Sequence, residues 1–297
     1  MSKQAESSGF DANSASAALD DLIHCLPDIH AYHASTTHLH RLLSPIALQA
    51  AHALFRDPNM QSKSFSVFGD VVMPYVEMGK VDSVDILNLN ELILFSFYWK
   101  NRHIYSHAAD LGANIGWHSL LLSRVGYEVR AWEPDPGTFA LLRRNLDANR
   151  CASVTPYCSA VSVHDGTARF VRVLGNLTSS HIEGSKTAPY GELEMFDVPL
   201  TAFSPIAAWA DLVKIDIEGH EADLLCSTDA SVWQATDALA EIGTHENAQR
   251  LFEHFNRIGV SIFSQKIGWQ RVRSADDIPV HYSEGSVFIS TKAAMPW

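Results

Sequence analysis

Apolar strand patterns alternate with helical patterns from about residue 105 onwards, and this alternation limits the folds available to the chain. Most of the short apolar runs are followed by a segment with helical spacing. The predicted strands include "YSHAADLG" (105–112), "YEVRAWEPD" (127–135), "SVTPYCSAVS" (153–162), "DLVKIDIEG" (211–219) and "DALAEIG" (237–243). Strands that alternate with helices at this interval predict an α/β fold with a mostly parallel, doubly wound sheet.

The N-terminal part of the chain lacks this alternation. Residues 1–16 are rich in Ser and Ala, which predicts disorder. Residues 17–64 form a predicted helical arm or cap, whose helical spacing runs to about residue 57 and is broken at Pro27 and Pro45. Residues 65–297 form the predicted α/β domain. We expect the arm to cover the site or to mediate a homodimer.

Composition and charge exclude several classes of partner. The net charge is −12, from 22 basic and 34 acidic residues, and no Lys/Arg cluster suggests a nucleic-acid surface. No apolar run approaches the roughly 20 residues of a membrane span, and the polar N-terminus does not resemble a signal peptide. We therefore expect a cytoplasmic protein with neither a nucleic-acid nor a membrane partner.

Histidines and cysteines do not form a recognisable metal pattern. The four cysteines contain no CxxC pair, and the histidines of the arm are irregularly spaced with few co-ligands. These residues are Cys25, Cys151, Cys158, Cys226, His24, His30, His33, His38 and His40. No metal site is predicted from them.

The turn "DLGANIG" (110–116) joins the first predicted strand of the alternating region to a helix. Its glycines let the backbone turn sharply and approach a ligand, and the helix start offers free N–H groups. The next strand ends in Glu133, which is placed to accept hydrogen bonds from both ribose hydroxyls. Together they indicate a cofactor that contains a nucleoside.

The turn distinguishes between two such cofactors. A dinucleotide fingerprint needs GxGxxG, but Ala113 and Asn114 stand where its second glycine would lie. Asp110 would repel phosphate and suits an ammonium or sulfonium group. These features favour S-adenosylmethionine over NAD, which leaves an NAD-dependent oxidoreductase as the alternative.

Four segments resemble the FkbM family of S-adenosylmethionine-dependent methyltransferases: "DLGANIGWHS", "EPDPGTFALLRRNL", "AVSVHDGTARF" and "VKIDIEGHEADLL". The similarity runs from about residue 65 to about 245. It implies a class I methyltransferase (Rossmann-like) fold with a seven-stranded sheet that ends in an antiparallel hairpin. It also implies methyl transfer, usually to a hydroxyl of a sugar or natural-product scaffold such as a polyketide or glycoside. N-methylation of a small molecule, and cofactor binding without transfer, are the alternatives.

The resemblance also implies positions for the cofactor. The turn residues would line its methionine end, Glu133 would hold the ribose with Asp135 beside the adenosine, and the turn after the third strand would flank the adenine. Glu91 is a further candidate, for the methionine amino group. The implied residues are Glu91, Asp110, Gly112, Asn114, Gly116, Glu133, Asp135, Ser159, Ala160 and Asn176 with Ser179 and Ser180.

The octet "KIDIEGHE" (214–221) carries the predicted catalytic groups. If strand alternation continues to Gly219, then Lys214, Asp216 and Glu218 share one face. Ligands of such sheets bind beyond the carboxyl ends of the strands, which places these acids beside the transferable methyl group. An alcohol acceptor profits from a nearby base.

The candidates for this base are Asp216, Glu218, His220 and Glu241, with His245 on the same rim. Two other interpretations of the octet are a divalent ion that chelates the acceptor, and a helix cap made by Glu218 or Glu221. Acceptor specificity is expected in the N-terminal segment and the loop 175–194.

Overall fold

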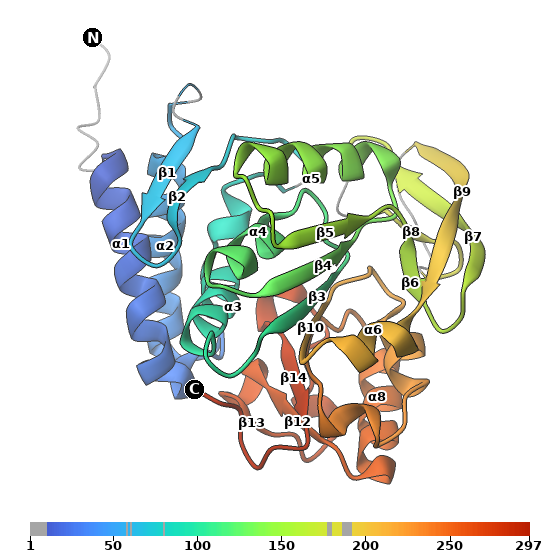
Figure 1. Ribbon diagram of the computed structural model, residues 1–297. Coiled ribbons are helices and arrows are strands. Elements are labelled where there is room, and N and C mark those ends of the chain that lie inside the picture. Colours follow the sequence, from blue (N-terminus) through green and yellow to red (C-terminus); the bar gives the residue numbers. More distant parts are fainter. Residues whose placement is uncertain (1–10, 58, 60, 80, 177–179, 186–191) are drawn as a thin grey trace.

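A sheet of eight strands forms the centre of the molecule (Figure 1). The computed structural model describes residues 11–57, 59, 61–79, 81–176, 180–185 and 192–297. Along the sheet the strands are β5 (Val154–Tyr157), β4 (Glu128–Trp132), β3 (His107–Leu111), β10 (Leu212–Ile215), β11 (Asp237–Ala240), β14 (Val287–Ser290), β12 (Ser261–Ser264) and β13 (Gln270–Arg271). The strands from β5 to β11 are parallel, and β14 is antiparallel to both of its neighbours. The predicted class I methyltransferase fold is confirmed, with the two-residue strand β13 as an addition to the seven expected strands.

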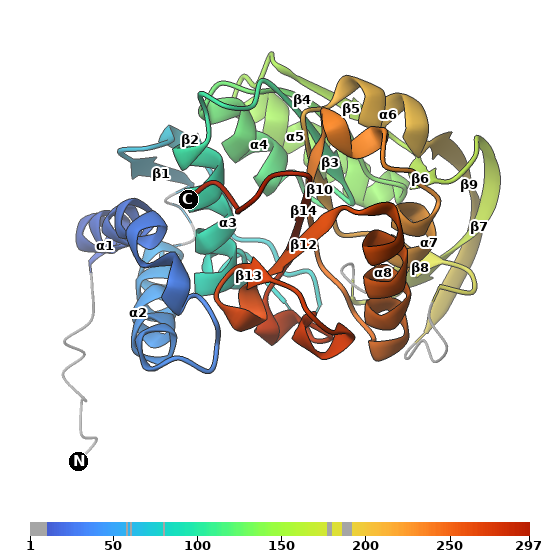
Figure 2. The same ribbon diagram turned by 90° about the horizontal axis from the view of Figure 1, so that it is seen from below.

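Helices cover both faces of this sheet because its strands are apolar on both sides. Ala108, Leu212 and Leu239 belong to one core with α3 (Leu89–Lys100), α4 (Trp117–Arg124) and α5 (Pro136–Ala148). Their neighbours Ala109, Val213 and Ala238 belong to the other core, with α6 (Phe203–Trp209), α7 (Glu221–Cys226) and α8 (His245–Ile258). Figure 2 shows α3 and α8 on opposite sides of the sheet. The helices cover the two faces of the sheet, and the carboxyl ends of its parallel strands form an edge between the two helical layers.

The N-terminal arm consists of α1 (Ala12–Cys25), the 3₁₀ helix η1 (Leu26–Tyr32) and α2 (His38–Leu54). The carboxylate of Asp11 caps α1 by accepting from the Ser14 N–H at 2.8 Å, so the prediction of disorder is wrong for residues 12–16. Residues 1–10 lie outside the described part. The chain leaves α1 before Pro27 as predicted, but Pro45 lies inside α2 and does not break it.

Packing explains why Pro45 is tolerated. The buried side of α2, with Ala47, Ala50 and Leu54, shares one apolar core with α1, α3 and the sheet, and this contact stabilises the helix despite one lost hydrogen bond. The boundary at residue 65 stays a prediction.

A second, four-stranded sheet lies beside β5 and α6 in the order β6-β9-β7-β8 (Figure 1). Its strands are β6 (Ala160–Ser162), β9 (Leu193–Ala202), β7 (Gly166–Val173) and β8 (His181–Ile182). The hairpin-like pattern at 163–174 predicts part of it, whereas β9 was not predicted. β9 has few buried positions, and its antiparallel pairing with β7 is what fixes it as a strand.

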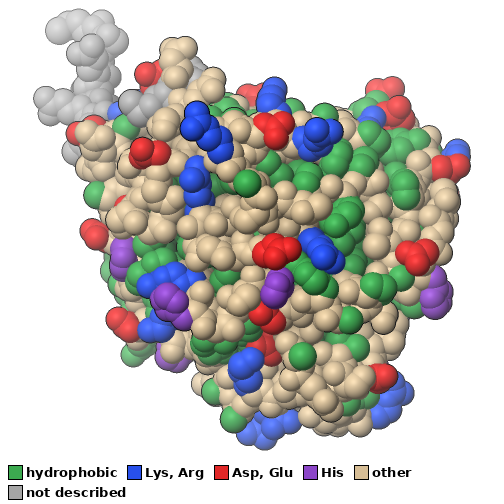
Figure 3. Space-filling model, viewed as in Figure 1, with side chains coloured by type: hydrophobic (Ala, Val, Ile, Leu, Met, Phe, Trp, Pro, Cys, Tyr) green, Lys and Arg blue, Asp and Glu red, His purple; other side chains and the backbone are tan. Residues whose placement is uncertain are grey.

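The remaining elements are short. They are the hairpin of β1 (Ser62–Phe65) and β2 (Gly69–Val72), and the 3₁₀ helices η2 (Asp85–Leu87), η4 (Val232–Gln234), η5 (Gln265–Ile267), η6 (Ala275–Asp277) and η7 (Tyr282–Glu284). No helix of the described residues is long and apolar enough to cross a membrane. On the face seen in Figure 3, Lys and Arg side chains are distributed among acidic ones.

Candidate functional site

The carboxyl ends of β3 and β10 meet where the strand order reverses, and a buried lysine joins them. Parallel register sets Lys214 beside Asp110, with Nζ 3.6 Å from the Asp110 carboxylate and 3.3 Å from that of Asp216. Burial alone would lower the pKa of Lys214, but the carboxylates of Asp216 and Asp110 raise it above its usual range. The lysine therefore stays charged and holds both strand ends.

Backbone contact brings the same two ends closer still. Gly112 has φ +74°, and a Cβ at this position would lie 1.8 Å from the backbone oxygen of Asp216. Lys214 also donates to the Gly112 carbonyl at 3.4 Å. A glycine is thus required here by the approach of β10 as well as by the turn itself.

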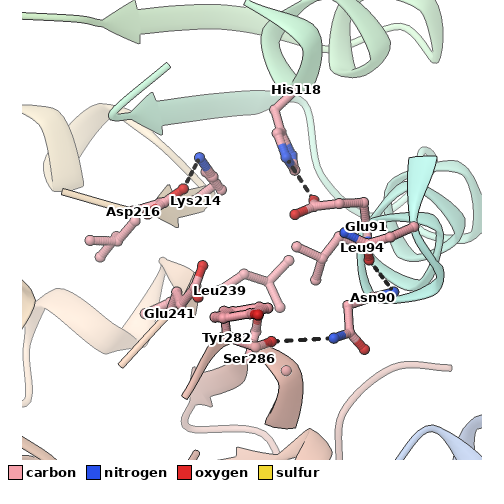
Figure 4. A pocket seen from close by; sticks show the side chains of 14 residues that line it. Asn90, Glu91, Leu94, His118, Lys214, Asp216, Leu239, Glu241, Tyr282 and Ser286 are labelled. Atoms are coloured by element: carbon pink, nitrogen blue, oxygen red, sulfur yellow. Dashed lines mark hydrogen bonds and ion pairs between the residues drawn. The ribbon is translucent and has the colours of Figure 1, made fainter. Parts of the chain in front are cut away.

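Two hollows open at this edge of the sheet. The β4 hollow has about 690 Å³ of space, including the part open to solvent. It is lined by Gly112, Asn114, Trp132, Glu133, Pro134, Ser159, Ala160, Val161, Phe170, Ser180, His181, Ile182, Asp216, Ile217 and Glu218. The β11 hollow is lined by Asn88, Asn90, Glu91, Leu94, His118, Lys214, Ile215, Asp216, Leu239, Ala240, Glu241, Tyr282, Gly285 and Ser286 (Figure 4). Asp216 borders both.

Glu133 is the buried acid of the β4 hollow. Its side-chain oxygens accept from the N–H of Asn114 at 3.0 Å and that of Asp135 at 2.9 Å. Burial raises the pKa of Glu133 to about 8, although these two N–H groups act in the opposite direction. The carboxyl therefore changes charge close to neutral pH.

Two further polar atoms of the β4 hollow have no partner. The side-chain oxygen of Asn114 and the indole nitrogen of Trp132 are buried and make no hydrogen bond within the described residues. A ligand with donors and acceptors of its own would satisfy them.

The predicted cofactor residues divide into three groups. Those that line the β4 hollow are Gly112, Asn114, Glu133, Ser159, Ala160 and Ser180, whereas Glu91 lines the β11 hollow. Those that line neither are Asp110, Gly116, Asp135 and Asn176, and Ser179 lies outside the described residues. Asp110 is fully buried and accepts from the Ser119 hydroxyl, and Asp135 caps α5 and pairs with Arg172.

The octet differs from the prediction in its backbone. β10 ends at Ile215, and Glu218 and Gly219 have φ of +58° and +106°, so strand alternation does not reach Glu218. Instead, the carboxylate of Glu221 accepts from the N–H groups of Ile217 and Gly219 and holds the loop in shape. Glu221 thus holds the loop before α7 and does not cap the helix, whose N-cap residue is His220 without a side-chain cap hydrogen bond.

The four predicted catalytic residues do not converge on one point. Glu241 lines the β11 hollow, and burial, followed by the carboxylates of Asp216 and Glu91, raises its pKa well above the usual range. Glu218 lines the β4 hollow. His220 lines neither hollow, because its ring lies between the Ser162 hydroxyl at 3.1 Å and the Asp223 carboxylate at 3.3 Å.

His245 is exposed at the start of α8 and also lines neither hollow. In the part of the chain that the structure describes, no group of three His, Cys, Asp or Glu side chains is placed to hold a metal ion.

Several residues of the β11 hollow were not predicted. Asn88 and Asn90 come from the start of α3, and Tyr282 and Ser286 from the loop before β14. None of them belongs to a motif, and only the packing of segments that are far apart in the sequence brings them together. His118 also lines this hollow, and its ring lies 3.0 Å from the Glu91 carboxylate and 3.0 Å from the Tyr98 hydroxyl.

Comparison with known proteins decides the family. The methyltransferase FkbM domain matches residues 110–258, half of the chain. The chain belongs to the FkbM methyltransferase family. This membership overturns the alternative of an NAD-dependent oxidoreductase.

Individual relatives of this FkbM-family chain are distant. It is 30% identical over 128 residues to the hexuronic acid methyltransferase AglP of Haloferax volcanii, an alignment that covers 39% of the chain and 47%, about half, of the relative. A SAM-dependent methyltransferase from Agrobacterium tumefaciens matches with a TM-score of 0.39 and 8% identity, over 78% of this chain and 70% of that one. The SAH-bound Podospora anserina methyltransferase PaMTH1 matches with a TM-score of 0.37 and 9% identity, over 72% and 83%.

S-adenosylmethionine is the cofactor of the family and of this chain. The β4 hollow suits it, because Glu133 can accept from ribose hydroxyls and Asn114 and Trp132 keep unsatisfied buried polar atoms. The carboxylates around Asp216 suit a sulfonium or ammonium group beside them.

Proposed function

We propose that this protein transfers a methyl group from S-adenosylmethionine to a hydroxyl of a sugar or natural-product scaffold. One observation carries the proposal: Asp216 borders both the β4 hollow and the β11 hollow. A carboxylate that lies between two adjoining hollows can contact a cofactor in one and an acceptor in the other. In this proposal the β4 hollow holds the nucleoside end of the cofactor and the β11 hollow holds the acceptor.

The proposed cofactor contacts follow from this division. Glu133 accepts from the ribose, Ser159 and Ala160 flank the adenine, and Gly112 and Asn114 form the wall next to the methionine end. Asp110 is a positioning residue, because it is buried and acts on the site through Lys214.

Asp216 and Glu241 are the proposed groups that orient the acceptor and take its proton. Bound S-adenosylmethionine supplies a methyl carbon activated by the sulfonium, so an aligned hydroxyl and a nearby base are what the protein must provide. Lys214 pairs with the Asp216 carboxylate at 3.3 Å, whereas the raised pKa of Glu241 makes it a strong base only in its ionised form. Their position on one rim of the β11 hollow suits an acceptor oxygen that enters from that side (Figure 4).

A sugar acceptor is supported by the relative AglP, which is described as a hexuronic acid methyltransferase, and by the polar lining of the β11 hollow. Calorimetry with S-adenosylmethionine, followed by mass spectrometry of a panel of glycosides, polyketides and amines, tests the proposal. We expect a glycoside to gain one methyl group while S-adenosylhomocysteine accumulates. Methylation of amines alone would replace O-methylation by N-methylation, and cofactor binding without any methylated product would contradict transferase activity.

A further inference from the structure

Tyr282 is an exposed aromatic residue at the β11 hollow. Its side chain lines the hollow, yet Tyr282 is 70% exposed (Figure 4). The ring of His281 packs against it with centroids 4.1 Å apart. A large ring that stays in solvent at the edge of a pocket is the kind of surface that a ligand covers.

The loop that carries Tyr282 is firmly held. Asn90 donates to the Tyr282 carbonyl at 3.2 Å, and Glu284 pairs with Lys266 at 3.1 Å. The buried Gln265 donates to Asn90 at 2.8 Å and accepts from the Ser286 N–H at 3.2 Å. These contacts hold the backbone of the loop, and the His281 ring packs against that of Tyr282, so a ligand that covers the ring has little loop ordering to provide.

The charges of the hollow restrict what can lie beside this ring. Lys214 is shared between Asp110 and Asp216, and His118 is paired with Glu91. The carboxylates of Asp110 and Asp216 thus share one lysine, and this excess of negative charge repels an acceptor that carries a carboxylate.

These observations lead to one inference, which rests on the proposed function. We propose that the acceptor is a pyranoside without a ring carboxylate, and that the ring of Tyr282 stacks on its C–H face. One face of a pyranose is largely apolar C–H surface, which packs on an aromatic ring, while its hydroxyl edge needs polar partners. The amides of Asn88 and Asn90 and the hydroxyl of Ser286 supply those partners around the ring.

The test is direct binding, which does not depend on turnover. The full chain is saturated with S-adenosylhomocysteine and titrated with methyl β-D-glucopyranoside, methyl β-D-galactopyranoside and methyl β-D-mannopyranoside by saturation-transfer NMR. We expect at least one to bind, Tyr282→Ala to weaken it by about tenfold or more, and Tyr282→Phe to retain it because the ring matters. Tyr32→Ala is the matched control, since Tyr32 is 55% exposed on the arm and lines neither hollow.

The second part of the test compares a neutral pyranoside with one that carries a carboxylate. Methyl β-D-glucopyranosiduronic acid should bind about tenfold more weakly than the glucoside, and Asp216→Asn should narrow that difference. The inference is overturned if no pyranoside binds, if Tyr282→Ala binds like the wild type, if Tyr282→Phe loses as much as Tyr282→Ala, or if the uronide binds as well as the glucoside. If a pyranoside binds through Tyr282 but is not methylated, the proposed function is contradicted and the stacking on Tyr282 still holds. If a pyranoside is methylated equally well by Tyr282→Ala, the proposed function holds and this inference is contradicted.

Discussion

The two hollows are neighbours, but the chain builds them in different ways. Most of the β4 hollow comes from the turns and strand ends around β3, β4 and β6, where the cofactor motifs lie. The β11 hollow combines the start of α3, the ends of β10 and β11, and the loop before β14. The first hollow is therefore built mainly from turns between successive elements, whereas the second depends on contacts between distant segments. Mutations should separate the two.

Lys214 joins the ends of β3 and β10 between the hollows, so its replacement should have the largest effect. Lys214→Met leaves the buried carboxylate of Asp110 without its cation, and loss of one partner of a buried pair costs about 3–5 kcal/mol. Urea denaturation measures the free energy of unfolding. Arg169→Met, which breaks the exposed pair with Asp197, is the control and should cost about 1 kcal/mol or less. Equal losses in both variants would contradict a linking role for Lys214.

Gly112 tests the contact between β3 and β10. In Gly112→Ala the new Cβ meets the Asp216 carbonyl and the backbone is left-handed, which together should cost about 2–5 kcal/mol and weaken cofactor binding. Gly126→Ala is a matched control, because its φ is +104° and nothing lies within 4 Å of the added Cβ. For Gly126→Ala we expect a loss of only about 1–2 kcal/mol in the free energy of unfolding, which is the cost of the left-handed backbone for a residue with a Cβ, and unchanged cofactor binding. Thermal unfolding and calorimetry report both quantities, and similar behaviour of the two variants would be evidence against the contact.

The charge of Glu133 tests the proposed assignment of the β4 hollow to the cofactor. Its pKa of about 8 means that the carboxyl is mostly protonated below pH 8 and mostly ionised above it. Ribose hydroxyls donate best to the ionised form, so S-adenosylmethionine affinity should rise by up to about tenfold per pH unit from pH 6 and level off above pH 8. Calorimetry should show Glu133→Gln with weaker binding and no such rise. Glu128→Gln, at the other end of β4, should behave like the wild type.

The pair Asp216 and His220 tests which groups of the octet serve the acceptor. Asp216→Asn should lower turnover by about tenfold or more, since it removes a carboxylate that borders both hollows. His220→Ala should lower turnover by no more than about threefold, because its ring is engaged by Ser162 and Asp223 outside both hollows. Steady-state kinetics with an identified acceptor compares the two variants. A larger loss in His220→Ala would reverse the roles proposed for these residues.

The sequence by itself determined the fold class and the cofactor turn. Alternating strand and helix patterns are local, and so is the rule that acids after parallel strands gather at one edge of the sheet. Gly112, Glu133 and Asp216, which were predicted in this way, all line the β4 hollow at that edge, and their roles stay predictions. The same local reasoning failed for the octet beyond Asp216, because the left-handed backbone of Glu218 and Gly219 ends the alternation and carries His220 away.

Only the tertiary structure decided the composition of the β11 hollow. Asn90 and Tyr282 are 192 residues apart in the chain, and a hydrogen bond between them forms because Gln265 and the arm hold α3 against the C-terminal loop. No spacing rule connects such segments, since their contact depends on the packing of whole layers. The residues of the proposed cofactor hollow could therefore be predicted from short motifs, whereas those of the proposed acceptor hollow could be identified only from the folded chain.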